Sequence, residues 1–409
     1  MRALHISSLF VIVVLFGCDS KKEFADFDNE EEVDGFRVIR NEVVLKELGA
    51  KKEEIAKQLA EPGEEDRDKL EEDLANTNRR LAYPEFFTYD ATLEDLPKGL
   101  SWKDGLDQPE LGSALAKRGG TFSTYFSGLS FPPTIRSIGK NANNSFRSEH
   151  WDNIEMALVS LHPNTMETIP GLADRWAVGE DGRTVYFRIN EKASWSDGNP
   201  VTVDDFFMTF HISLSEYVTG PWYRQYYGTM FENITRYDDR HLSVRLANKK
   251  PKPEYYASLT PYSRAFYREF GPDFESRYNW RVRPTTGAYQ ILKEDVVKGR
   301  SITLSRVKDW WAKDQKYYRH RFNVDRIKYS VVRSDEKVFE LFKKGEIDMF
   351  HLGLPKRWYE QMEIPEVFNG YIEKKTFYNV YPRVPRGLYI NHSRPFLGDV
   401  NVRIGLQHA

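Results

Sequence analysis

The clearest pattern of hydrophobic and polar positions lies just before the middle of the chain. Residues 184–189 alternate, so that Val185, Phe187 and Ile189 share one face of a strand. The preceding Asp181-Gly182 pair favours a tight turn, because glycine adopts a positive φ at little cost. Together with the apolar residues 176–178, the pattern predicts a β-hairpin with one buried side.

A helical pattern follows a second turn. Thr202 and Asp205 have the spacing of a capping box, and apolar residues then recur at helical intervals up to Leu214. The pattern predicts a helix from about Val203 to Tyr217. Nothing in this stretch requires chemistry, so we interpret its most distinctive residues as buried scaffold: Trp176, Trp195, Asp197 and Phe206.

The same patterns recur downstream and predict an α/β fold. Residues 234–237 with 242–246, and 290–292 with 302–305, form two further hairpins, and residues 327–331 form a strand. Ser334 caps a helix over Asp335–Lys343 that Gly345 terminates.

The N-terminal quarter has a different character. Residues 19 to about 35 are acidic and polar, which indicates a solvated tether. Two segments, 42–60 and 64–81, are rich in Glu, Lys, Leu and Ala and are separated by Pro62-Gly63, so we expect a helical hairpin. Its apolar positions are sparse. It is either a spacer that docks on the protein or a coiled coil that binds a partner. A loop-rich connector follows, over residues 83–111.

Length and charge narrow the function. The chain has 409 residues. A single hydrophobic core rarely serves more than ~250–300 residues, so we expect two or more lobes. The net charge of −2 provides no basic field for nucleic acid. The nine histidines are scattered, and no metal-binding, phosphate-binding or nucleophile motif is present. We therefore expect no enzyme activity, no metal and no cofactor.

The first 18 residues have the layout of a secretory signal. Arg2 precedes an apolar run at residues 9–16, which is far shorter than the ~20 residues of a membrane-spanning helix. Leu15-Phe16-Gly17-Cys18 resembles a bacterial lipobox, which implies that Cys18 is lipidated and becomes the mature N-terminus. Cys18 is the sole cysteine of the chain. The alternative is that Cys18 is not lipidated and is simply one more small apolar residue of the signal segment. Asp19 favours retention on the inner membrane.

Several motifs in order resemble the family 5 extracellular solute-binding proteins of bacteria. They are Lys117–Phe122, Pro170-Gly171-Leu172-Ala173, Trp195-Ser196-Asp197-Gly198, Thr286-Gly287-Ala288-Tyr289, Gly345–Asp348 and Tyr389-Ile390-Asn391. The resemblance implies a two-lobed α/β fold like that of type II periplasmic binding proteins. It also implies that residues 117–349 form the first lobe, with Gly345–Asp348 closing its last strand, and that residues 350–409 begin a second, incomplete lobe after an N-terminal extension over residues 19–116.

The family resemblance implies a monomeric periplasmic lipoprotein that delivers oligopeptides or similar solutes to the permease subunits of an ABC importer. It would touch the membrane only through its lipid anchor. By their order in the family, the loops at 125–131 and 217–227 and the strand at 389–391 are expected to line the ligand cleft, with these candidate residues: Tyr125, Leu129, Trp222, Tyr223, Tyr226, Tyr389 and Asn391. The alternative is a truncated relative that acts outside transport, as a lipoprotein that binds a partner or has a regulatory role.

Overall fold

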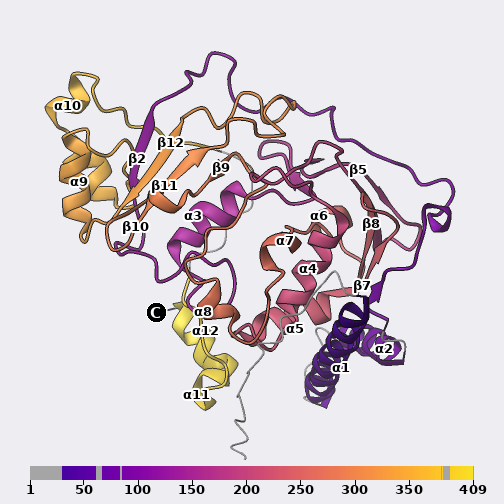
Figure 1. The fold of residues 1–409 in the computed structure, drawn as a ribbon. Coiled ribbons are helices and arrows are strands. Elements are labelled where there is room, and N and C mark those ends of the chain that lie inside the picture. Colours follow the sequence, from indigo (N-terminus) through magenta and orange to yellow (C-terminus); the bar gives the residue numbers. More distant parts are fainter. Residues whose placement is uncertain (1–29, 61–66, 83–84, 379, 381–386, 409) are drawn as a thin grey trace, which may run out of the picture.

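The protein has the expected α/β architecture, built on two separate sheets (Figure 1). The computed structural model describes residues 30–60, 67–82, 85–378, 380 and 387–408. The signal segment and Cys18 lie outside these residues. None of the described helices combines the length and apolar character that crossing a membrane requires.

The first sheet contains the hairpin that the alternating residues 184–189 predicted. Its strand order is β1 (Phe87–Thr88), β7 (Phe231–Arg236), β8 (His241–Leu246), β6 (Thr184–Ile189) and β5 (Ala173–Val178). The predicted hairpins β5–β6 and β7–β8 are both confirmed, with Trp176 opposite Phe187 and Ile234 opposite Val244. β1 joins the edge of the sheet parallel to β7.

The second sheet unites strands from distant parts of the chain. Its strands are β10 (Val296–Val297), β11 (Ser301–Arg306), β12 (Arg326–Ser330) and β2 (Thr121–Tyr125), with β9 (Tyr289–Gln290) also paired to β11. The predicted β9–β11 pairing and the strand β12 are confirmed. β2 and β12 run parallel, so the strand at the start of the family-like region pairs with one about two hundred residues later in the chain. A small ribbon of β3 (Val159–Leu161) and β4 (Thr168–Pro170) lies outside both sheets.

Helix α4 (Val203–Ser213) begins where predicted but is shorter. Asp205 accepts the backbone N–H of Thr202 at 2.9 Å, which completes one half of the capping box. The helix ends before Tyr217 because the N–H of Tyr217 bonds to the hydroxyl of Ser215, which diverts the backbone into a turn. The following residues, predicted as a loop, form helix α5 (Pro221–Met230), which starts on a proline at a position that favours helix initiation.

The N-terminal hairpin consists of α1 (Glu30–Ala60) and α2 (Arg67–Ala82). The helical pair is confirmed, but α1 begins at Glu30, so the predicted tether is helical in its last part. Val44 and Leu48 are buried in the main core, and α1 packs along α5. The hairpin therefore docks on its own chain, as in the first of the two predicted alternatives.

The remaining helices are mostly short. They are α3 (Ser145–Ile154), α6 (Pro253–Tyr256), α7 (Arg264–Tyr267), α8 (Phe274–Arg277), α9 (Asp335–Lys343), α10 (Pro365–Phe368), α11 (Pro395–Gly398) and α12 (Val400–His408). Single turns of 3₁₀-helix occur at Leu93–Asp95 and Lys293–Asp295, and Arg357–Gln361 is a π-helical turn. The helix predicted over Asp335–Lys343, capped by Ser334, is confirmed.

Two predicted strands are wrong. Around Gly345–Asp348, the N–H of Asp348 bonds to the carbonyl of Ser123 at 2.8 Å, but the carboxylate of Asp348 then takes the N–H of Ser123. A side chain thus replaces the backbone partner and no ladder extends. Residues 389–391 lie outside both sheets, and Tyr389 is 85% exposed.

Three of the four predicted scaffold residues lie in the main hydrophobic core. Trp176 and Trp195 are each 2% exposed and Phe206 is fully buried. Asp197 is exposed instead, and its carboxylate accepts the N–H of Asn199 at 3.1 Å to close the turn. The prediction of buried scaffold is therefore confirmed for the three aromatic residues and wrong for Asp197, whose contribution to the fold is a turn at the surface.

Candidate functional site

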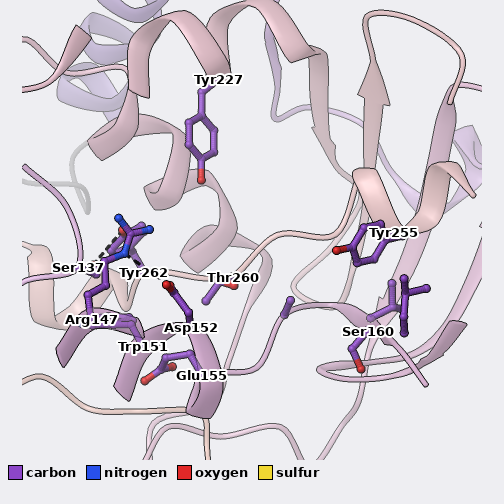
Figure 2. Close-up of a pocket in the computed structure, with 13 residues that line it drawn as sticks. Ser137, Arg147, Trp151, Asp152, Glu155, Ser160, Tyr227, Tyr255, Thr260 and Tyr262 are labelled. Atoms are coloured by element: carbon purple, nitrogen blue, oxygen red, sulfur yellow. Dashed lines mark hydrogen bonds and ion pairs between the residues drawn. The ribbon is translucent and has the colours of Figure 1, made fainter. Parts of the chain in front are cut away.

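A cavity of about 390 Å³ lies between α3, α5, α6 and the segment before α7 (Figure 2). In Figure 2, Tyr227 points from α5 toward Arg147 and Asp152 of α3, while Tyr255 and Ser160 lie on the side away from Arg147. Its lining combines tyrosines with both signs of charge: Ser137, Arg147, Trp151, Asp152, Glu155, Ala157, Val159, Ser160, Leu161, Tyr227, Tyr255, Thr260 and Tyr262.

Helix α3 supplies the charged side chains that face the cavity. Asn144 caps it by accepting the N–H of Arg147 at 3.2 Å, and Phe146, Trp151 and Ile154 are buried. Arg147 then donates to the hydroxyl of Tyr223 at 3.1 Å and lies 3.5 Å from the carboxylate of Asp152. The side chain of Asp152 is 52% exposed, so this pair remains open to an incoming group.

Glu155, in contrast, is committed to the fold. It pairs with Arg283 at 2.9 Å, and the two side chains are only 1% and 8% exposed. The N–H and hydroxyl of Thr286 donate to its other oxygen at 3.3 and 3.1 Å. Arg283 also stacks over the ring of Trp151, and burial lowers the pKa of its guanidinium. The charge of Glu155 is thus satisfied within the protein, which leaves Arg147 and Asp152 for a ligand.

Two glycines of the family-like motifs hold the end of α3 in place. A Cβ on Gly171 would lie 2.2 Å from the carbonyl oxygen of Ala157, and one on Gly287 would lie 2.0 Å from that of Ile154. Both separations are far below van der Waals contact, so only glycine permits these backbones to approach. The motifs at 170–173 and 286–289 therefore fix the segment that forms one wall of the cavity.

Helix α4 positions another wall of the cavity. Thr209 donates its hydroxyl to the carbonyl of Thr260 at 3.0 Å, and the carbonyl of Asp205 accepts the N–H of Tyr262 at 3.1 Å. The carboxylate of Asp205 also accepts the N–H of Arg264 at 2.7 Å. Residues of α4 do not line the cavity themselves, but they hold the 260–264 segment, whose Thr260 and Tyr262 do.

The tyrosines give the cavity neutral hydroxyls on aromatic walls. Burial raises the pKa values of Tyr227 and Tyr262, so both phenols stay protonated near neutral pH. The hydroxyls of Tyr262 and Ser137 lie 3.0 Å apart. A cation, a carboxylate and neutral hydroxyls beside aromatic rings suit a small solute that carries both an acid and an amine. Across the described residues no group of three or more acidic, histidine or cysteine side chains is arranged to hold a metal ion.

The predicted lining residues of α5 fall into two groups. Tyr223 is not among the residues that line the cavity, but its hydroxyl accepts a hydrogen bond from Arg147, which is. Trp222 and Tyr226 stack on each other with ring centroids 4.9 Å apart, and Trp222 is 58% exposed. Tyr226 packs against the main core.

The other predicted lining residues lie elsewhere. Tyr125 and Leu129 pack in a separate apolar cluster with Phe350, and Leu129 has a φ of 54°. Asn391 accepts the N–H of Ser393 at 3.0 Å, so it caps a turn, next to the exposed Tyr389.

Sequence reasoning missed α3, which joins the two predicted lining segments. Its Glu149 accepts the N–H of Ser127 in the 125–131 loop at 3.2 Å, while its Arg147 reaches Tyr223 of α5. The available signal was Asn144 as an N-cap before apolar residues at 146, 151 and 154. That signal indicates a helix, but not which side chains it brings to a cavity.

A second cavity, of about 470 Å³, lies between the Asp197-Gly198 turn and β11. Trp310 and Trp311 line it, and both donate their indole N–H to the carbonyl of Thr286, at 2.8 and 3.0 Å. None of the candidate lining residues from the sequence borders this cavity. None of them lines the cavity at α3 either, but Arg147, which does, donates a hydrogen bond to the candidate Tyr223. The cavity at α3 is therefore the better candidate site.

Fold and motif order identify the class of the protein. Residues 167–409 match the sequence model described as bacterial extracellular solute-binding proteins, family 5 middle. The chain belongs to this family, whose members bind solutes and are not enzymes, and it contains part of the type II periplasmic binding protein fold.

Among individual relatives, a Brucella melitensis protein named as a binding protein is 28% identical over 305 residues, covering 73% of this chain and 48% of the relative. The peptidoglycan-binding protein YepA of Agrobacterium fabrum is 29% identical over 252 residues, covering 58% and 39%. The periplasmic oligopeptide-binding protein OppA of Escherichia coli is 27% identical over 260 residues, covering 58% and 44%. The chain spans about half the length of the curated relatives it matches or less.

Proposed function

We propose that this protein captures peptides, or peptide-bearing fragments of peptidoglycan, as the solute-binding component of an ABC importer. The observation that carries the proposal is the open pair of Arg147 and Asp152 in a tyrosine-lined cavity. Arg147 offers a fork of donors to a carboxylate, and Asp152 accepts from an ammonium group. One relative is named for binding oligopeptides and another for binding peptidoglycan. Oligopeptides and the peptide parts of peptidoglycan both carry carboxylate and amino groups, which are the groups that Arg147 and Asp152 can bind.

The binding cycle follows from two lobes that close on a solute. Residues 117–349 form the first lobe, residues 350–409 begin the second, and residues 19–116 extend the N-terminus. Tyr223 contacts the solute beside Arg147, with Tyr125, Leu129, Trp222, Tyr226, Tyr389 and Asn391 as further lining residues of the closed cleft. Transport requires no reaction on the solute. It requires only that the closed state bind the solute more tightly than the open state does.

The protein acts outside the cytoplasmic membrane, as its family does. Cys18 carries the lipid that anchors it there, with the inner membrane favoured. It works as a monomer that hands its solute to the permease subunits of the importer. The hairpin α1–α2 packs on α5 of the same chain, which supports this role over that of a partner-binding relative.

Isothermal titration calorimetry of the full-length protein tests the proposal. The probes are short unmodified peptides, the same peptides with both termini blocked, and soluble peptidoglycan fragments. We expect binding of free peptides or fragments and much weaker binding of blocked peptides, because blocking removes the charges that Arg147 and Asp152 recognise. Binding of a neutral sugar, with no binding of any peptide-bearing probe, would overturn it.

A further inference from the structure

Helix α5 is held on the side away from the cavity by a single buried arginine. Arg80 of α2 is 4% exposed. Its guanidinium donates to two carbonyls in the last turn of α5, those of Gly228 and Thr229, both at 2.9 Å, and to the carbonyl of Phe231, the first residue of β7, at 2.5 Å. The last carbonyls of a helix have no partners within the helix, and a cation there complements the helix dipole. Arg80 thus caps α5 from a distant part of the chain.

Helix α1 adds contacts along the length of α5. Glu47 lies 3.9 Å from the guanidinium of Arg224, and its side chain packs against Gly228, where an added Cβ would lie 3.4 Å away. Figure 1 shows α1 and α2 beside the start of β7, next to α5. The position of α5 is therefore set by the hairpin at both its middle and its end.

The other side of α5 faces the candidate site. Tyr227 lines the cavity, and the hydroxyl of Tyr223 accepts the bond from Arg147. A helix behaves as a rigid rod over ten residues, so a displacement of its end moves Tyr223 and Tyr227 together. Misplacing a binding group by about 1 Å is enough to lose much of its contribution.

We propose that the α1–α2 hairpin is a positioning clamp, in which Arg80 holds α5 so that Tyr223 and Tyr227 present the site to the solute. Arg80 is a positioning residue, since it does not touch the cavity. This inference rests on the proposed function and adds that solute affinity depends on an N-terminal extension remote from the site.

The rival explanation is that the hairpin only stabilises the fold. The neighbouring Arg79 provides a matched control, because it belongs to the same helix and donates to Glu232 of β7 at 2.7 and 2.6 Å instead of to α5. Arg80→Ala removes the cap of α5, whereas Arg79→Ala removes an ion pair of the same hairpin. Arg80→Lys keeps the charge with a single donor group and serves if the alanine variant does not fold.

The experiment measures hydrogen–deuterium exchange of the α5 peptide and the affinity for an equimolar mixture of short unmodified peptides, on folded full-length protein. We expect Arg80→Ala to accelerate exchange in residues 221–230 and to raise the Kd about tenfold, with Arg80→Lys intermediate. Arg79→Ala should leave both quantities within about twofold of wild type.

Two results would overturn the clamp. One is a lower melting temperature for Arg80→Ala with an unchanged Kd, which would assign Arg80 to stability alone. The other is unchanged exchange of α5. If the wild-type protein binds none of the peptides, the proposed function itself fails. If the wild-type protein binds peptides and Arg80→Ala binds them equally well, only the clamp fails.

Discussion

Trp195 donates its indole N–H to the carboxylate of Asp205 at 3.2 Å, which ties the turn at Asp197-Gly198 to the first turn of α4. The same oxygen of Asp205 accepts the N–H of Thr202 at 2.9 Å, and its other oxygen accepts that of Arg264 at 2.7 Å. One buried carboxylate thus joins the turn at Asp197-Gly198, helix α4 and the 260–264 segment that lines the cavity.

The bond between Trp195 and Asp205 predicts a specific loss of stability. Trp195→Phe removes one donor from a buried carboxylate while keeping an aromatic ring, so we expect a loss of about 1.5–3 kcal/mol in the free energy of unfolding. Urea denaturation followed by circular dichroism measures it. Trp222→Phe, at a side chain that is 58% exposed, should change stability by less than about 0.5 kcal/mol. Equal, small effects of both substitutions would contradict the prediction.

Asp205 also predicts a pH dependence. Burial raises the pKa of its carboxyl from 3.8 to about 6, against the lowering by the N–H donors of Thr202 and Arg264. The folded state therefore holds this proton more tightly than the unfolded chain does. The stability from this group is fully present below pH 3.8 and is lost as the pH rises through about 6. The loss is at most on the order of 3 kcal/mol.

Other carboxylates obscure this trend in wild type alone. Burial raises the pKa of Glu232, but hydrogen bonds from Arg79 and Arg183 outweigh it and leave this pKa below its ordinary value, so its contribution runs in the opposite direction. The measurement is therefore the difference in unfolding free energy between wild type and Asp205→Asn from pH about 4 to about 7. We expect wild type to lose stability relative to the variant as the pH rises. A constant difference across this range would refute the assignment.

Sequence reasoning predicted those parts of the fold whose structure depends mainly on residues close together in the chain. Alternation and turn residues defined the hairpin β5–β6, and the capping pair Thr202 and Asp205 defined the start of α4. The strands expected at 345–348 and 389–391 failed for the same physical reason, since a strand needs a partner that local sequence does not reveal.

The candidate site shows this limit most clearly. Arg147 meets Tyr223 across 76 positions of the chain, and Glu155 meets Thr286 across 131. No local pattern connects these residues. Family order directed attention to α5 and its Tyr223, but α3, which supplies the charges, has an ordinary amphipathic sequence and carries no motif that marks a ligand.

The close approach at Gly287 predicts a severe substitution. In Gly287→Ala the new methyl group would lie 2.0 Å from the carbonyl oxygen of Ile154, so the end of α3 must move or the 285–289 turn must shift. We expect a loss of about 3 kcal/mol or more in unfolding free energy, in the range of severe overpacking. Gly271→Ala is the control, because its nearest neighbour is 4.0 Å away. Comparable thermal melts for the two variants would show that the approach is not tight in solution.

Arg147 provides the most direct test of the site. Arg147→Gln removes the charge that would meet a carboxylate but keeps a donor for Tyr223, so the fold should tolerate it. We expect affinity for unmodified short peptides to fall about tenfold or more, equivalent to ~1.4 kcal/mol per factor of ten, and the weak affinity for peptides with blocked termini to change little. Ser148→Ala, on the exposed side of the same helix, should bind like wild type. Calorimetry supplies the Kd, and a melting curve confirms that both variants fold. Equal losses for free and blocked peptides would mean that Arg147 shapes the cavity without recognising the carboxylate, which would remove the charge argument from the proposed function.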